Sequence, residues 1–459
     1  MRGKVSLSLL ASALVVNAMA ADDLAGMFKE GKASGQLRAF FIDRDYDGYS
    51  NATSVHRNAT AVGGYLKYDT GAWNGVSLGA AFYTSNGLFL KDKTTSSGAD
   101  NPEVDPTLLG KSNDSVTYLG EAYLQYKNGN TTFKGGRQKL DTPLAGSDDA
   151  RMLPNLFEAY VLTNTDVKDT TLIAAHVTKF AQGTFGRAYN GAGGVPDKVL
   201  SGTSGYSLVD TKNYVGEFVD MGTYAIGDNT GGVSVLAAVY TGIKGLKLQL
   251  WDYYAHDILN AVYTEANYGW SYASGISPYV GVQWINERDV GSNNASPALE
   301  LNKIESDFVA AKVGAKIGNC DVSVAVSHNT KDDASAINGG TVSPWGGMPA
   351  YTQGMVTRHQ FMAGTDAWKV AASYDWKDYG VNLNTGVFYV EYDMDPLNGY
   401  SDAVSADKAT EAGFDIIYNP QVVKNLQLRL RGNFPRGYKE TTAGNMGWDE
   451  YRVIANYNF

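Results

Sequence analysis

Residues 137–160 read RQKLDTPLAGSDDARMLPNLFEAY, and this stretch shapes the interpretation of the whole chain. It begins and ends with short strand-like runs, and the connection between them, about a dozen residues, is long for a loop. An apolar pair, Met152 and Leu153, accompanies its charges, although a solvent-exposed loop has little reason to carry an apolar tip. We therefore predict a constriction loop folded into a water-filled barrel, with the pair against the wall. The charged residues expected to face the passage are Asp141, Asp148, Asp149 and Arg151.

Taken alone, this stretch has a simpler alternative. It could be a surface loop with one helical turn that starts at Ala150 and is capped by Ser147 or Asp148. The rest of the chain favours the barrel.

Alternation of apolar and polar residues recurs along the chain, whereas helical spacing is confined to a short piece near residues 24–30. Leu246, Leu248 and Leu250 alternate with more polar neighbours, and residues 36–41, 121–127 and 426–431 follow similar patterns. A soluble sandwich would cover the apolar face, whereas a membrane barrel turns it to lipid and lines its interior with the polar face.

The connections differ strongly in length, and short and long ones alternate. Eight short turns centre on residues 69–75, 127–130, 164–169, 241–245, 271–275, 317–320, 376–380 and 419–425. Nine loops, all but one of them long, centre on residues 43–58, 85–116, 140–155, 181–231, 256–257, 290–304, 331–366, 393–409 and 435–447. With 206–225 read as loop, this pattern predicts an all-β, antiparallel transmembrane barrel of eighteen strands, with short periplasmic turns and long external loops.

Residues 1–20 have the pattern of a secretory signal peptide. Arg2 and Lys4 precede an apolar run, and Ala18 and Ala20 form a cleavage pattern. The run is too short to span a membrane as a helix. We expect a mature chain of residues 21–459 that forms one outer-membrane barrel domain.

Composition excludes several classes of protein. Cys320 is the only cysteine, so neither an intrachain disulfide nor a cysteine metal cluster can form. The formal net charge is −10, and removing Arg2 and Lys4 leaves −12. A nucleic-acid partner would need a basic footprint, so none is expected. No residue pattern predicts a cofactor or a metal site.

The chain ends with YRVIANYNF, in which Tyr451, Val453, Ala455, Tyr457 and Phe459 share one face and Ile454 breaks the polar pattern of the other. The final aromatic strand, with Tyr457 and the terminal Phe459, looks like the signal read by the barrel-insertion machinery of Gram-negative outer membranes.

The chain resembles the OprD-type porins, including the related major porins of epsilon-class bacteria. The resemblance is carried by GGRQKLDTPL (135–144), SDDARMLPNLFEAY (147–160), VLTNTDVKDTTLIAAHV (161–177), SGQLRAFF (34–41) and the last strand. It implies an eighteen-stranded barrel embedded in outer-membrane lipids, an inward third loop, passive uptake of small hydrophilic solutes and, as in related porins, a homotrimer.

The same resemblance implies a ladder of basic side chains on the wall. Its candidates are Arg38, Arg137, Arg429 and Arg431. Strict alternation from Phe133 would point Arg137 to lipid, unless a bulge at Gly135–Gly136 reverses it. We expect Asp148 and Asp149 to face Arg429 and Arg431 across the narrowing and to create a transverse field there. Better-known members of the family favour carboxylates or basic amino acids. The acid-rich loop leaves open which charge the channel prefers.

Two other functions compete with a pore. A hydrolytic barrel would need a nucleophile, a base and an orienting group, but none of the five histidines can be tied to a serine by its spacing. We therefore expect no enzymatic activity. A structural or adhesive surface protein would use the loops at 181–231 and 331–366 as exposed surfaces, and this role can coexist with a pore.

Overall fold

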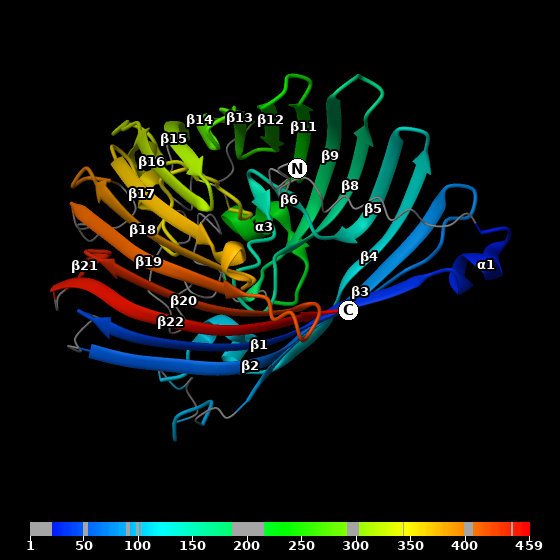
Figure 1. Cartoon of the computed structure of the whole chain (residues 1–459), viewed down its shortest axis with the longest axis horizontal. Coiled ribbons are helices and arrows are strands. Elements are labelled where there is room, and N and C mark those ends of the chain that lie inside the picture. The colour runs from blue at the N-terminus through cyan, green and yellow to red at the C-terminus, as the bar shows by residue number, and fades with distance from the viewer. Residues whose placement is uncertain are drawn as a thin grey trace.

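The wall of the molecule is a closed ring of eighteen long antiparallel strands (Figure 1). The computed structural model describes residues 21–48, 54–88, 92–97, 101, 103–185, 215–291, 303–342, 344–398, 407–441 and 444–459. The proposed signal peptide therefore lies outside the described residues. The wall strands are β1 (Lys32–Asp47), β2 (Ser54–Asp69), β3 (Val76–Gly87), β4 (Val116–Asn128), β5 (Thr131–Gln138), β8 (Leu156–Asn164), β9 (Thr170–Ala181), β11 (Val233–Tyr240), β12 (Leu246–Ala255), β13 (Leu259–Gly269), β14 (Ile276–Asp289), β15 (Glu305–Ile317), β16 (Cys320–Asn329), β17 (Asp366–Asp375), β18 (Leu383–Asp393), β19 (Lys408–Tyr418), β20 (Leu426–Arg436) and β22 (Gly444–Asn458).

The remaining elements are short. They are α1 (Leu24–Lys29), α3 (Met221–Ile226), β6 (Asp141–Thr142), β7 (Ala145–Gly146), β10 (Val219–Asp220), β21 (Lys439–Thr441) and the 3₁₀ turns at Pro106–Leu108, Lys111–Asn113, Ala336–Gly339, His359–Phe361 and Trp376–Tyr379. Among the described residues, no helix is long and apolar enough to cross a membrane.

The two ends of the chain close the ring. β1 pairs with β22 from Gln36 opposite Asn458 to Asp47 opposite Gly447. The terminal Phe459 continues this ladder, because its amide donates to Gly35 O at 3.1 Å and its carbonyl accepts from Gly35 N at 3.0 Å. A Cβ at Gly35 would lie 2.5 Å from the Phe459 ring, so only glycine fits beside the last residue.

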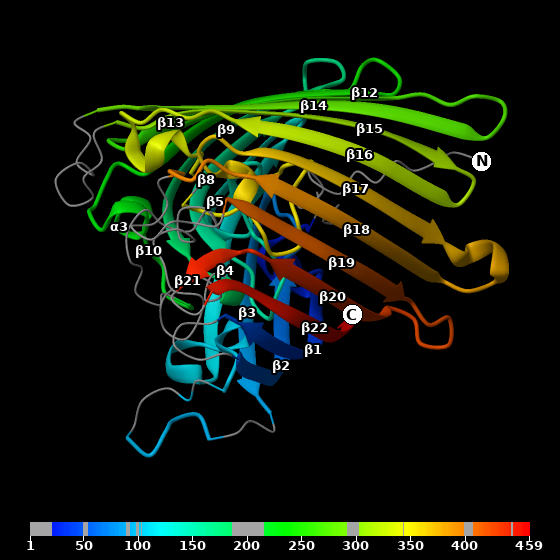
Figure 2. The ribbon, with the colours of Figure 1, turned by 90° about the vertical axis from the view of Figure 1, so that its left-hand side faces the viewer.

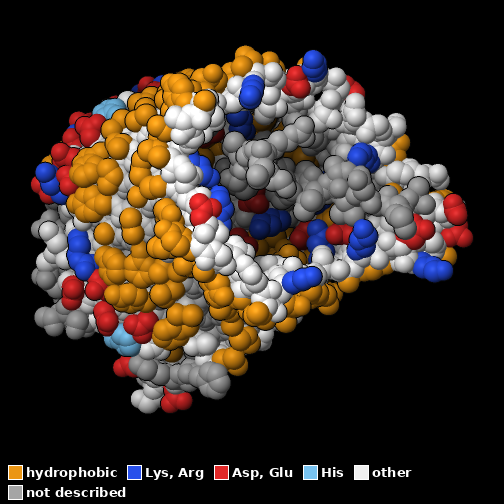
Figure 3. Space-filling view, in the orientation of Figure 1, with side chains coloured by type: hydrophobic (Ala, Val, Ile, Leu, Met, Phe, Trp, Pro, Cys, Tyr) orange, Lys and Arg blue, Asp and Glu red, His pale blue; other side chains and the backbone are white. Residues whose placement is uncertain are grey.

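The predicted alternation is confirmed in space. On β1, Leu37 is 61% exposed on the outer face, whereas Arg38 is buried inside the ring. Ile454, the exception in the last strand, is also buried on the inner face. Figure 3 shows the outer wall covered with hydrophobic side chains, and Lys, Arg, Asp and Glu side chains gathered in the hollow of the ring.

The eight short turns lie where alternation predicts them, at one end of the barrel, with the long loops at the other end. Figure 2 shows the turns that follow β15, β17 and β19 on the right. The first loop is shorter than predicted, because β1 runs to Asp47 and β2 begins at Ser54. The helical piece near residues 24–30 is α1. The described part of 206–225 adds no wall strand, as predicted, but forms the short β10 and most of α3.

One expectation about the loops is wrong. The described parts of residues 331–366 and 181–231 are not mainly exposed surfaces, since much of each packs inside the ring. Buried residues in them include Tyr224, Thr341, Trp345, Thr357 and Phe361. Figure 1 shows α3 and β6 within the circle of strands. We call residues 139–155 loop L3 and residues 330–365 loop L7, by their order at the long-loop end.

Candidate functional site

Loop L3 crosses the lumen, as predicted, and touches opposite parts of the wall. Near its tip, Leu144 N donates to Tyr253 Oη on β12 at 3.3 Å. Farther along the loop, Asp149 reaches Arg38 on β1. β6 and β7 form a small hairpin inside L3, and the alternative helical turn at Ala150 is absent. Loop L3 therefore spans the lumen from β12 to β1.

An apolar cluster fixes L3 to the wall. Met152 and Leu153 are fully buried and pack in a cluster with Phe40, Ile42 and Ile454 of the closing strands. This is the arrangement predicted from the sequence. Burial of two such side chains stabilises the loop by several kcal/mol, at about 1.5–3 kcal/mol each.

Alanine at Met152 or Leu153 should loosen L3 and raise the single-channel conductance, because each substitution removes about 2–5 kcal/mol of packing. Conductance in a planar bilayer checks this expectation. Leu162→Ala, on the outer face of β8, is the matched control. An unchanged conductance in both loop variants would contradict the anchoring role.

The carboxylate of Asp149 lies against basic groups of the wall and of L3 itself. It accepts from Arg38 Nη1 at 2.6 Å and lies 3.5 Å from Lys139 Nζ. Burial would raise the pKa of this carboxyl, but Arg38 and Lys139 together hold it below its usual value. Arg38 is held in place in turn by Asn456 on β22 at 2.9 Å and by the backbone oxygen of Arg151.

Nearer the long-loop end of the wall, one buried carboxylate accepts hydrogen bonds from three arginines. Glu450 on β22 accepts from Arg44 at 2.5 Å, from Arg151 of L3 at 3.1 Å and from Arg452. Asp105 adds a second carboxylate 3.0 Å from Arg44. Three guanidiniums against two carboxylates leave an excess of one positive charge in this cluster.

The predicted arginines of β20 form a third basic cluster. Arg429 donates to Asp415 on β19 at 2.7 Å, and Arg431 lies 3.4 Å from the same carboxylate. Arg431 is opposite Arg452 in the β20–β22 ladder, so this cluster adjoins the previous one. It too carries one excess positive charge.

These clusters form one ladder along β1, β22 and β20. Strand register places its members in the following order from the short-turn end upward: Arg38, Arg429, Arg431 level with Arg452, and Arg44. Arg44 and Arg452 were not among the predicted members of the ladder. Arg44 fell within the predicted first loop, residues 43–58, and Arg452 lies on the polar face of the last strand. Extending the two-residue alternation of β1 from Arg38 would have placed Arg44 on the same inner face.

Two expectations about the site are corrected. Asp148 and Asp149 do not face Arg429 and Arg431 across a gap, because Asp149 is paired with Arg38 and Asp415 holds both arginines of β20. L3 lies on the basic wall rather than opposite it.

Arg137 does not belong to the ladder. The register of β5 runs without a bulge through Gly135 and Gly136, so Arg137 shares the outer face with Phe133. It lies 3.7 Å from Glu158 and over the ring of Phe218. Strict alternation predicted this position correctly.

The other predicted acidic residues of L3 organise the loop itself. Asp141 accepts from the amide and the hydroxyl of Ser147. Asp148, in the left-handed region with φ 41°, accepts from Gly347 N of L7 at 3.2 Å. A Cβ at Gly347 would lie 2.2 Å from Pro143 O, so glycine permits the two loops to meet.

Loop L7 is fastened inside the barrel by wall carboxylates, which sequence patterns did not indicate. Glu411 on β19 accepts from the amides of Met355, Val356 and Thr357 at 3.0–3.2 Å and from the Thr357 hydroxyl at 2.6 Å. Glu287 on β14 accepts from Val342 N at 2.9 Å. L3 and L7 together narrow the lumen.

A buried imidazole makes L7 sensitive to acid. Burial lowers the pKa of His359 from its ordinary 6.5 to about 4. An opened loop binds the proton at the ordinary pKa, so the packed form loses stability as pH falls from 6.5 towards 4, by up to about 3 kcal/mol. Hydrogen exchange of residues 344–363, corrected for the intrinsic effect of pH, should therefore rise in that window. Exchange that does not change between pH 7 and pH 4.5 would contradict this coupling.

Below L3 the lumen widens into a cavity of about 690 Å³. Lys67 lies 3.2 Å from Glu121 and 3.7 Å from Asp69. Lys134 Nζ lies 3.8 Å from the ring centroid of Tyr123 and has no ion pair among the described residues. Arg38 of the ladder and Asp149 of L3 also line this cavity, so the cavity adjoins the lowest basic cluster of the wall.

Comparison with known proteins shows which family has this architecture. The model of the outer membrane porin, OprD family, matches residues 25–186 and 210–459. No curated protein sequence matches the chain. Among solved structures, OccK9 (OpdG) of Pseudomonas aeruginosa has a TM-score of 0.72 at 20% identity, over 94% of this chain and 99% of that one.

Two other similar structures contain small molecules. OpdK of Pseudomonas aeruginosa with vanillate has a TM-score of 0.69 at 16% identity, over 94% of this chain and 99% of that one. OccK2 (OpdF) of the same organism, in complex with glucuronate, has a TM-score of 0.68 at 17% identity, over 94% and 97%. The chain belongs to the OprD family of outer-membrane porins and is a passive channel of the Gram-negative outer membrane.

Proposed function

We propose that this porin admits small carboxylates in preference to cations of the same size. The observation that carries the proposal is the charge balance of the ladder. The clusters around Asp149, Glu450 and Asp415 each hold one more cation than carboxylate. A narrow passage beside such a wall raises the local concentration of anions.

The chemistry of the wall suits a carboxylate solute. A guanidinium donates two parallel hydrogen bonds to a carboxylate, and successive arginines offer successive weak contacts. A solute held too tightly at one point would not leave, so a ladder serves passage better than one deep site. That OpdK and OccK2 hold vanillate and glucuronate supports the same solute class for this chain.

The proposed roles of the loop residues follow from their contacts. Asp149 and Arg151 position L3 on the ladder, whereas Asp141 and Asp148 maintain the loop's shape and its contact with L7. Arg38, Arg429 and Arg431 present positive charge to the solute.

Three hexose derivatives test the proposal, because they share a ring and differ in charge. Flux of glucuronate, glucose and glucosamine into proteoliposomes should decrease in that order. Faster entry of glucosamine than of glucuronate would contradict the proposal.

We infer that Tyr457 and Phe459 serve as the insertion signal and that residues 1–20 are removed on export. The aromatic pair is stacked at 6.5 Å and half-exposed at the end of β22. Phe459→Ala should reduce the folded, heat-modifiable barrel in outer membranes but not the refolding of purified chain in detergent. Equal amounts of wild-type and variant barrel in the membrane would refute the signal.

A further inference from the structure

A row of polar and aromatic side chains crosses the outer face of the barrel near the long-loop end. Cross-strand pairing joins Tyr160 to His176, His176 to Ser234 and Ser234 to Tyr254. The row continues through Asn260 to Arg288. Because it lies next to the external loops, it lies at the level of the lipid headgroups of the outer leaflet.

The centre of this row is a group of hydrogen-bonding side chains. Ser234 Oγ lies 3.0 Å from His256 Nε2 and 3.2 Å from His176 Nδ1. The two imidazole rings are 6.1 Å apart, and the Tyr254 ring packs edge-on against His256 at 4.9 Å. Two imidazoles and one hydroxyl therefore converge on one spot of the outer surface.

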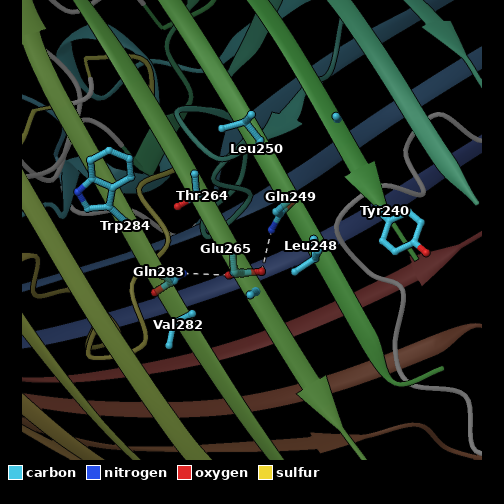
Figure 4. A pocket seen from close by; sticks show the side chains of 11 residues that line it. Tyr240, Leu248, Gln249, Leu250, Thr264, Glu265, Val282, Gln283 and Trp284 are labelled. Carbon is cyan, nitrogen blue, oxygen red and sulfur yellow. Dashed lines mark hydrogen bonds between the residues drawn. The ribbon is translucent and has the colours of Figure 1, made fainter. Parts of the chain in front are cut away.

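An apolar groove of about 410 Å³ lies on the same strands, closer to the short turns (Figure 4). Its floor is formed by the small residues Ala238, Thr264 and Ala266. Larger side chains border it, and these are Tyr240, Leu248, Leu250, Val282 and Trp284 (Figure 4). Ala238 is four residues below Ser234 on β11, a distance of about 14 Å along a strand.

The two charged groups near the row and the groove already have partners. Asp252, between the row and the groove, accepts from Asn260 at 2.6 Å, and Arg288, at the end of the row, donates to Asp307 at 2.7 Å. The donors at the centre of the row are therefore the two imidazoles and the Ser234 hydroxyl. Hydrogen-bond donors directly above an apolar groove match a lipid whose headgroup carries acceptor oxygens.

We propose that this surface binds one phosphate-bearing lipid of the outer leaflet. Its acyl chain lies in the groove, and its phosphate accepts hydrogen bonds from His176, His256 and Ser234. Because the face points outward from a membrane barrel, the occupant of the groove is a lipid chain. The headgroup contacts make the site selective, since hydrocarbon alone would bind there without preference.

Native mass spectrometry of the detergent-solubilised barrel tests the proposal with two probes that have the same chains. Dipalmitoyl phosphatidate should be retained at least fivefold more than dipalmitoylglycerol. His176→Gln/His256→Gln should abolish this preference, and Ala238→Leu/Ala266→Leu should reduce retention of both lipids. His328→Gln and Ala372→Leu, elsewhere on the outer face, are the matched controls and should behave as wild type.

Three results would overturn the lipid site. They are equal retention of the two probes by wild type, a preference that persists in His176→Gln/His256→Gln, and full displacement of phosphatidate by an equal concentration of inorganic phosphate. Each variant is first shown to be folded by its heat-modifiable band, so lost binding cannot be attributed to a misfolded barrel.

Discussion

Replacing Arg429 and Arg431 together with glutamine should strongly reduce the anion preference of the channel. The pair and Asp415 now carry a net charge of +1, and the double variant leaves −1 at the same place on the wall. A unit charge about 4 Å away contributes about 1 kcal/mol to a carboxylate even in water-like surroundings. Removing two such positive charges should therefore lower the glucuronate-to-glucosamine flux ratio roughly 10- to 30-fold.

The matched control for this prediction is Arg436→Gln. Arg436 is also an arginine of β20, but it is half-exposed near the long loops and pairs with Asp449. It should leave the flux ratio unchanged. A double variant that kept the wild-type ratio would remove Arg429 and Arg431 from the selective wall.

Replacing Glu450 with glutamine should destabilise the closing seam of the barrel and release L3. The substitution removes the negative charge shared by three buried arginines, of which Arg151 belongs to the loop. Leaving buried charge without its partner typically costs about 3–5 kcal/mol. We expect a lower temperature for loss of the heat-modifiable band and a higher single-channel conductance.

A second substitution separates this mechanism from a general loss of packing. Arg151→Met removes one of the three cations, so adding it to Glu450→Gln should recover part of the lost stability. If the stability lost in the double variant equals the sum of the losses in Glu450→Gln and Arg151→Met, the two residues do not share a charge interaction. Asp449→Asn, at the neighbouring residue but on an exposed side chain, should have little effect.

Local patterns in the sequence were sufficient to predict the wall. Alternation repeats within each strand, and the difference between short and long connections is visible without any contact between distant residues. The same reasoning identified L3, because Met152 and Leu153 are apolar where a surface loop would be polar.

The parts that sequence reasoning missed depend on contacts between distant segments. Glu450 meets Arg44 only because the last strand pairs with the first. Glu411 and Glu287 fasten L7, which has no local pattern that distinguishes an inward loop from an exposed one. At Arg137, the family resemblance suggested the lumen, and the period of the strand was the better guide.

The reversal potential of the wild-type channel in a salt gradient reports directly whether anions or cations pass more easily. With a tenfold KCl gradient across a planar bilayer, we expect a reversal potential of the sign set by chloride, because the ladder has excess positive charge beside the narrowing. A reversal potential of the sign set by potassium would show that the arginine ladder does not make the channel anion-selective.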